Sequence, residues 1–157
     1  MRDPVLVCAH PGAGKTTAAR QFNNIEDLDK IYCTKKDIDD LFWLYGKFDK
    51  NILAMPILGQ FITKFSALER KLGSRIILAY PSIECVDEYM DRYHERGDDM
   101  FCFYTRRDLL VRSIEGYNKL KTINVEKVPM KPKEYLTDVL AARGLVDDAC
   151  KNENYVV

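Results

Sequence analysis

The sequence predicts an α/β domain of three layers, in which helices cover both faces of a mostly parallel sheet. Short apolar runs rich in β-branched residues alternate with longer amphipathic segments, the order of elements that such a sheet requires. The 157 residues suit one domain, and no internal repeat or linker divides them. The expected strands cover residues 4–9, 25–28, 51–58, 75–80 and 125–128. The expected helices cover residues 15–22, 36–50, 60–72, 85–96, 101–120 and 132–142.

The first half of the chain supplies three of these strands. Residues 4–9 form an apolar run of the kind that is buried on both faces of a sheet. Residues 51–58 include Pro56, which we expect at the end of its strand because proline cannot donate to the ladder. Apolar side chains recur at helical spacing in 36–50 and again in 60–72, so both segments are predicted to be helices.

In the second half of the chain, residues 75–80 are the clearest strand, and Pro81 ends it. Residues 85–96 are predicted to form a highly charged helix that Gly97 terminates. The helix expected over 101–120 has first turns that are equally compatible with a loop. The last strand and helix have shorter and weaker patterns.

Composition argues against several classes of protein. Lys and Arg total 24 and Asp and Glu total 24, so the chain lacks the bulk positive charge of a protein that coats nucleic acid or an anionic membrane. Five cysteines form no C-x-x-C pair, which disfavours a zinc knuckle or a dithiol redox site. No apolar run approaches the ~18 residues of a membrane span. We therefore expect a reduced, cytoplasmic protein with no membrane partner.

A glycine-rich turn lies between the first strand and the first helix, in the segment Ala9–Thr16. In this context backbone N–H groups can wrap a phosphate, and Gly12 and Gly14 allow the close approach that this requires. The segment resembles the Walker A motif of P-loop NTPases, with Ala9 in place of the first glycine. The alternative is a plain glycine turn. The expected nucleotide-binding residues are Pro11, Gly12, Ala13, Gly14, Lys15, Thr16 and Thr17.

Two carboxylates follow the second predicted strand. Asp27 and Asp29 flank a leucine, so in an extended segment their side chains point the same way, beside the phosphate-binding turn. The pair resembles the acidic residues that small P-loop kinases of the shikimate-kinase and zeta-toxin kind carry here. That resemblance implies roles in ordering Mg²⁺, with Thr16 and Asp29 at the metal, and in positioning the acceptor or taking its proton. The alternative is a turn that caps a helix.

The charged helix carries a stripe of Glu88, Arg92 and Arg96 at four-residue spacing, with tyrosines on the neighbouring stripe. Arginines on a lid that closes over the γ-phosphate are a common device in nucleoside monophosphate kinases. We therefore take Lys15, Arg92 and Arg96, with the two aspartates, as candidate catalytic residues. The alternative is a solvated helix with Glu–Arg pairs.

Taken together, residues 4–29 and 75–97 resemble small P-loop kinases of the nucleotide-kinase type, and in detail phage-encoded ones. The resemblance implies a single P-loop kinase-like domain over 1–157, about five strands in the order 2-3-1-4-5, and a lid-like helical segment around 83–107. It implies ATP and Mg²⁺ as cofactors and a cytoplasmic location, in the host cell if a phage encodes the chain. The oligomeric state is left open.

Three functions follow from these residues. The first is phosphotransfer from Mg-ATP to a small nucleotide-like acceptor, either a nucleoside monophosphate or a nucleotide hydroxyl. The second is a kinase that acts on nucleic-acid ends or modified bases. The third is a nucleotide-binding module without catalysis. A GTPase is disfavoured, because the segment beginning at Asn118 lacks the final Asp of the base-reading N-K-x-D motif.

Overall fold

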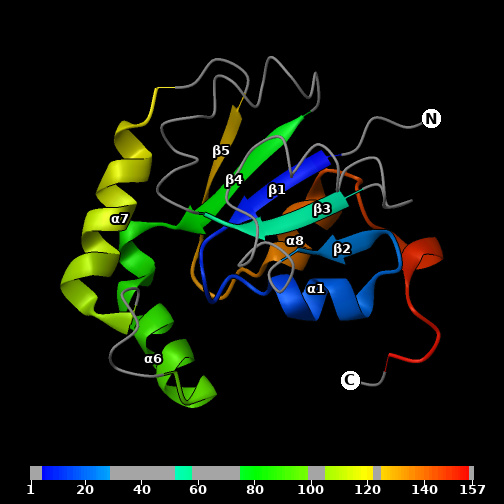
Figure 1. Cartoon of the computed structure of the whole chain (residues 1–157), viewed down its shortest axis with the longest axis horizontal. Helices are drawn as coiled ribbons and strands as arrows, with labels where there is room; N and C mark the ends of the chain where they lie inside the picture. The colour runs from blue at the N-terminus through cyan, green and yellow to red at the C-terminus, as the bar shows by residue number, and fades with distance from the viewer. Residues whose placement is uncertain (1–4, 29–51, 58–74, 99–104, 122–124, 156–157) are drawn as a thin grey trace.

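A five-stranded parallel sheet forms the centre of the protein (Figure 1). The computed structural model describes residues 5–28, 52–57, 75–98, 105–121 and 125–155. In this part of the chain the strand order is β2-β3-β1-β4-β5, and each neighbouring pair is parallel. The predicted order is thus confirmed. The strands are β1 (Val5–Ala9), β2 (Ile25–Asp27), β3 (Ile52–Pro56), β4 (Ile76–Pro81) and β5 (Val125–Met130).

The first strand of the sequence is the central strand of the sheet. All five residues of β1 are buried, as its apolar composition predicts for a strand with neighbours on both sides. At the carboxyl end of β1, Ala9 pairs with Pro56 of β3 and with Ala79 of β4. The chain that leaves β1 therefore emerges in the middle of the carboxyl edge, where open α/β sheets bind ligands.

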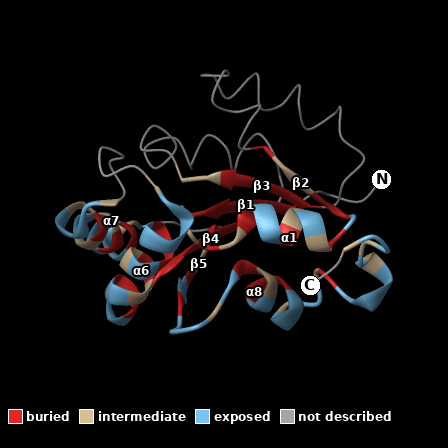
Figure 2. Ribbon diagram, turned by 90° about the horizontal axis from the view of Figure 1, so that it is seen from below, coloured by how far each residue is buried: buried red, intermediate tan, exposed pale blue. Residues whose placement is uncertain are grey.

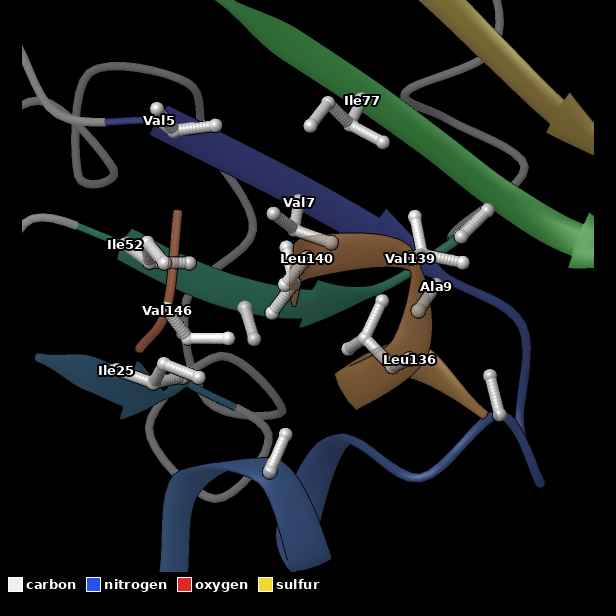
Figure 3. Close-up of a cluster of buried hydrophobic side chains, with 14 of the residues drawn as sticks. Val5, Val7, Ala9, Ile25, Ile52, Ile77, Leu136, Val139, Leu140 and Val146 are labelled. Atoms are coloured by element: carbon white, nitrogen blue, oxygen red, sulfur yellow. The ribbon is translucent and has the colours of Figure 1, made fainter. Parts of the chain in front are cut away.

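Two helices cover one face of the sheet, α1 (Lys15–Gln21) and α8 (Leu136–Ala142) (Figure 2). Between them and the strands lies a core of small and branched apolar side chains, to which every strand contributes (Figure 3). The alternation along β1 sends Val5, Val7 and Ala9 into this core. Because Ala9 and the loop residue Ala13 are both in it, the core holds the start of the loop as well as the sheet.

Two further helices, α6 (Val86–Arg96) and α7 (Arg107–Lys119), pack on each other beside β4 and β5 (Figure 1). A second apolar cluster joins them, made of Cys85, Val86, Tyr89, Tyr93, Leu110 and Ile114. A short 3₁₀ turn (η1, Ile83–Cys85) links β4 to α6, and Gly97 ends α6 with φ 71° as predicted. Among the described residues, no helix combines the length and the apolarity that crossing a membrane requires.

Several element boundaries differ from the sequence prediction, and three of those in the second half of the chain differ by two residues or more. The last strand continues beyond Val128 to Met130, and α7 begins only at Arg107. The last helix begins at Leu136 instead of residue 132, because Lys133 adopts a left-handed φ of 64° that no helix contains. The Lys133 N–H bonds to the carboxylate of Glu88 in α6 at 2.8 Å, a tertiary contact that the local pattern does not reveal. The helices predicted over 36–50 and 60–72 lie outside the described residues.

Candidate nucleotide-binding site

The glycine-rich turn joins β1 to α1, as the sequence predicts. Ala9 is fully buried and paired on both sides within the sheet, so the alanine at the first motif position is a strand residue that needs no glycine. Gly12 and Gly14 have φ values of 92° and 101°, which side-chain-bearing residues rarely adopt. The two glycines therefore stand where the backbone conformation demands them.

Every carbonyl group from Ala9 to Gly14 accepts a hydrogen bond, and five of the six donors come from α1, α6 or the start of α8. A trans peptide directs its N–H opposite to its C=O, so a carbonyl that is anchored by a neighbouring element turns the following N–H to the other side. That arrangement is the backbone nest that binds anions. The Ala13 N–H is the exception, because it already bonds to His10 O within the turn. The donors are Lys15 Nζ to Ala9 O (3.3 Å), Ala13 N to His10 O (3.1 Å), Tyr93 Oη to Pro11 O (2.8 Å), Arg92 Nη1 to Gly12 O (2.8 Å), Leu136 N to Ala13 O (2.8 Å) and Ala18 N to Gly14 O (2.9 Å).

Lys15 is the first residue of α1, and its side chain folds back over the turn to reach the Ala9 carbonyl. The residue is only 8% exposed, which is an unusual position for a lysine. Its charge acts on the neighbouring titratable groups. It adds to the lowering of the pKa of His10 that burial causes, and it partly offsets the rise that burial causes in the pKa of Cys8. A buried cation beside an anion nest is suited to binding a phosphate.

Thr16 and Asp27 are brought together from different elements. Thr16 Oγ1 donates to Asp27 Oδ2 at 3.1 Å, and Asp27 is the last residue of β2. Mg²⁺ in nucleotide sites is commonly held by a hydroxyl, one or two carboxylates, waters and phosphate oxygens. This hydroxyl–carboxylate pair beside Lys15 fits such an ion. The described residues contain no group of three or more His, Cys, Asp or Glu placed to hold a metal by themselves.

Asp29, the second predicted carboxylate, lies outside the described residues, and its role stays a prediction. Among those described, β3 runs out through Pro56 and Ile57 and β4 through Pro81 and Ser82, with no carboxylate at either end. Among the described residues, Asp27 is therefore the acidic side chain that lies at the carboxyl end of a strand near the turn.

The two arginines predicted for a lid occupy different surroundings. Arg92 is buried and contacts the carbonyl side of the turn, where Nη1 bonds to Gly12 O. Arg96 lies one helical turn further on, forms an ion pair with Asp98, and stacks its guanidinium 5.7 Å from the ring centre of Tyr93. The structure thus brings Arg92 to the turn, while its predicted contact with the γ-phosphate stays a prediction, as does that of Arg96.

Two tyrosines that contact the turn were not among the predicted site residues. Tyr93 donates to Pro11 O, and the ring of Tyr135 lies 3.3 Å from where a Cβ on Gly14 would be. The signal for Tyr93 was available, since it and Tyr89 form the stripe beside the arginines on α6. Tyr135 precedes α8 and had no local signal, because its contact depends on how the chain folds.

His10, which the sequence marks only as a loop residue, is buried between tyrosine rings. Its Nδ1 lies 3.0 Å from Tyr117 Oη, and its Nε2 has no partner in the described part of the protein. Burial, aided by the charge of Lys15, lowers the pKa of His10 to about 3. The imidazole is therefore neutral at physiological pH and packs as part of the support of the turn.

This low pKa predicts a specific acid sensitivity. Between pH 6.5 and about 3 the unfolded chain binds a proton at His10 that the folded protein does not, so lowering the pH in this window favours unfolding. The contribution amounts to up to about 1.4 kcal/mol for each pH unit. Urea titrations from pH 7 to pH 4 should show a shallower loss of unfolding free energy in His10→Gln than in wild type. Tyr117→Phe, which keeps the burial that chiefly causes the shift, should retain the wild-type slope; parallel slopes for all three would contradict the prediction.

No protein-family model matches the chain, and no curated protein matches its sequence. A solved structure, that of the tunicamycin resistance protein of Deinococcus radiodurans, superposes with a TM-score of 0.55. The match covers 92% of this chain and 98% of that one, at 12% sequence identity. The parallel sheet, its strand order and this superposition agree.

The chain has the P-loop kinase-like fold. The turn between β1 and α1, residues 9–16, carries Gly12, Gly14 and Lys15 and is called the P-loop below. At 12% identity the likeness concerns the fold.

Proposed function

We propose that the protein is an ATP-dependent phosphotransferase that moves the γ-phosphoryl group of Mg-ATP to a nucleotide-like acceptor. The observation that carries the proposal is the state of the P-loop, whose carbonyls from Ala9 to Gly14 are all directed to donors while Lys15 lies buried across it. A loop that is already shaped for an anion, in a P-loop kinase-like fold, supports a polyphosphate ligand.

We assign each group a role in binding or transfer. The inward N–H groups of the P-loop and the Lys15 ammonium hold the β- and γ-phosphates. Thr16 and Asp27 would hold Mg²⁺, which would supply charge neutralisation on the phosphate oxygens when bound. Asp29, two residues after Asp27, positions the acceptor, and Arg96 closes over the transferred group.

The transfer forms a bond between an acceptor oxygen and the γ-phosphorus and breaks the bond from that phosphorus to the β–γ bridging oxygen, so that ADP leaves. For a hydroxyl acceptor the proton passes to one of the two aspartates. A nucleoside monophosphate or a nucleotide hydroxyl is the acceptor we favour. Lys127 on β5 donates to the carbonyls of Tyr117, Asn118 and Leu120 at the end of α7. Its ammonium group thus caps that helix, which disfavours a role for this lysine in binding nucleic acid.

The test combines binding and transfer. The melting temperature should rise with ATP and Mg²⁺, and labelled phosphate should pass from ATP to one member of a panel of nucleoside monophosphates, nucleosides and hydroxylated metabolites. Transfer to DNA or RNA oligonucleotides alone would favour the nucleic-acid kinase. Binding without transfer to any acceptor would favour a nucleotide-binding module. A melting temperature that ATP and GTP leave unchanged would exclude all three.

Replacement of Asp27 by Asn should separate metal use from nucleotide binding. The amide can still accept from Thr16, so the fold should be kept, but the loss of charge weakens the hold on Mg²⁺. We expect kcat to fall by about 10- to 100-fold and the Mg²⁺ concentration for half-maximal activity to rise. Metal-free ATP should bind no more weakly, because a repulsive charge has been removed. Glu26→Gln, one residue away on β2, is the control, and equal effects in both variants would contradict the role of Asp27.

A further inference from the structure

The guanidinium of Arg92 lies at the meeting point of three segments, namely the P-loop, α6 and the turn before α8. Its Nη1 donates to Gly12 O at 2.8 Å, and its Nη2 donates both to Glu88 Oε2 and to Glu134 O at 3.1 Å. The guanidinium carbon lies 4.4 Å from the ring centre of Tyr89 and 3.9 Å from that of Tyr135. Arg92 therefore has an aromatic ring against it from each of two elements and hydrogen bonds to all three.

These bonds reach the P-loop by two routes. One is direct, since the carbonyl of Gly12 accepts from Arg92 while the N–H of Ala13 in the same peptide bonds to His10 O. The other route passes through the turn before α8. Glu134 O in that turn accepts from Arg92, and the N–H of Leu136, two residues later, bonds to Ala13 O. Two consecutive peptides of the P-loop are thus oriented by one side chain.

The turn itself is attached to the same helix. Glu88 receives the Lys133 N–H on one oxygen at 2.8 Å and Arg92 on the other at 3.1 Å. This contact holds Lys133 in its left-handed conformation, so that the chain can present Glu134 O and Leu136 N toward the loop. Glu88 and Arg92 act together as a brace.

Stability alone is a poor explanation for this arrangement. Burying a guanidinium carries a desolvation cost that a well-packed apolar side chain avoids, and Arg92 Nε is buried without a partner among the described residues. The planar guanidinium offers a fixed geometry, because it can form hydrogen bonds in several directions in its plane while its face stacks on an aromatic ring. A lysine offers a point charge without a plane and cannot reproduce these contacts.

We infer that Arg92 is a positioning residue that orients the P-loop peptides at Gly12 and Ala13 for binding of the polyphosphate. Fixing the Ala13 carbonyl outward directs the Gly14 N–H inward, where a phosphate oxygen would lie. The inference rests on the proposed function, and it assigns Arg92 to the support of the loop, with no contact to the transferred phosphoryl group required.

The test measures the dissociation constants of ATP and of inorganic tripolyphosphate, which lacks a base, for wild type, Arg92→Ala and Arg92→Lys. We expect both variants to bind both ligands at least about tenfold more weakly. Addition of millimolar guanidinium chloride should restore part of the affinity of Arg92→Ala and leave wild type unchanged. Arg143→Ala is the control: Arg143 is ion-paired with Glu126 on β5, and its loss should lower the melting temperature without changing either dissociation constant.

The outcomes separate this inference from the function on which it rests. If wild type binds neither ligand, the proposed function fails, and the role of Arg92 fails with it. If wild type binds and Arg92→Lys binds equally well, only the role of Arg92 is overturned. Should the Arg92 variants fail to fold, Glu88→Gln decides, because it weakens the same brace and keeps its shape; wild-type affinity for tripolyphosphate in that variant would overturn the inference.

Discussion

Lys15→Ala should abolish ATP-dependent phosphotransfer while the protein stays folded. The ammonium lies across the P-loop at the Ala9 carbonyl. From there it can neutralise negative charge on the β–γ bridging oxygen and on the γ-phosphoryl group during transfer. Removal of one such donor from an oxyanion site typically costs about 100- to 1,000-fold in rate, and here a full charge is lost as well. The free energy of unfolding should change little. Loss of the hydrogen bond to the Ala9 carbonyl costs about 1 kcal/mol, but the substitution also removes the desolvation cost of a buried cation.

Thermal unfolding with and without Mg-ATP, together with transfer of labelled phosphate, measures both parts of this prediction. Arg20→Ala is the matched control, since Arg20 is a basic residue in the last turn of the same helix and is exposed. It should retain the ATP-induced rise in melting temperature that Lys15→Ala loses. If Lys15→Ala kept wild-type turnover, the identification of the turn as a catalytic P-loop would be wrong.

Gly12→Ala should damage both the fold and the site. The φ of 92° is strained for any residue with a Cβ, at about 1–2 kcal/mol. The added Cβ would also lie 2.9 Å from Cε1 of Tyr93 and 3.4 Å from Cδ2 of Tyr89. Overpacking of this kind costs about 1–3 kcal/mol, and relief by moving Tyr93 would break its bond to Pro11 O. We therefore expect a loss of unfolding free energy of about 2–4 kcal/mol and weaker ATP binding.

The protein contains a matched control for this substitution. Gly144, just beyond α8, has φ 68° and no atom within 4 Å of an added Cβ. Gly144→Ala should show only the backbone part of the cost, about 1 kcal/mol, with unchanged ATP affinity. Urea denaturation and ATP titration of the two variants would distinguish them, and equal losses of stability would show that contact with the tyrosines is unimportant.

The sequence predicted the sheet well because its signals are local. Each of the five described strands lies within or overlaps a predicted apolar run, and β1 and β4 were the clearest because central strands need continuous apolar residues. The P-loop could be predicted from Gly12, Gly14 and Lys15 since the conformation depends on residues within the turn itself.

The surroundings of the P-loop could not be predicted in the same way. Arg92 and Gly12 are 80 residues apart, and Arg92 and Glu134 are 42 apart, so no local pattern connects them. The four-residue spacing of Glu88, Arg92 and Arg96 is equally compatible with a lid, with a solvated helix face and with a brace against the P-loop. The late start of α8 has the same origin, because the contact of Lys133 with Glu88 overrides local helix propensity.

The hydrogen bond from Leu136 to the Ala13 carbonyl has a consequence for how the protein is made. The P-loop leaves the ribosome early, but the strand before it, β1, pairs with β3 and β4, which are synthesised later. The last anchor of the P-loop, the Leu136 N–H that bonds to Ala13 O, is synthesised later still. A polyphosphate ligand bound as proposed above could therefore assist the nascent chain only after nearly all of the sheet has emerged. A polypeptide released before α8 would keep the complete glycine-rich motif and still lack the scaffold that gives the motif its shape.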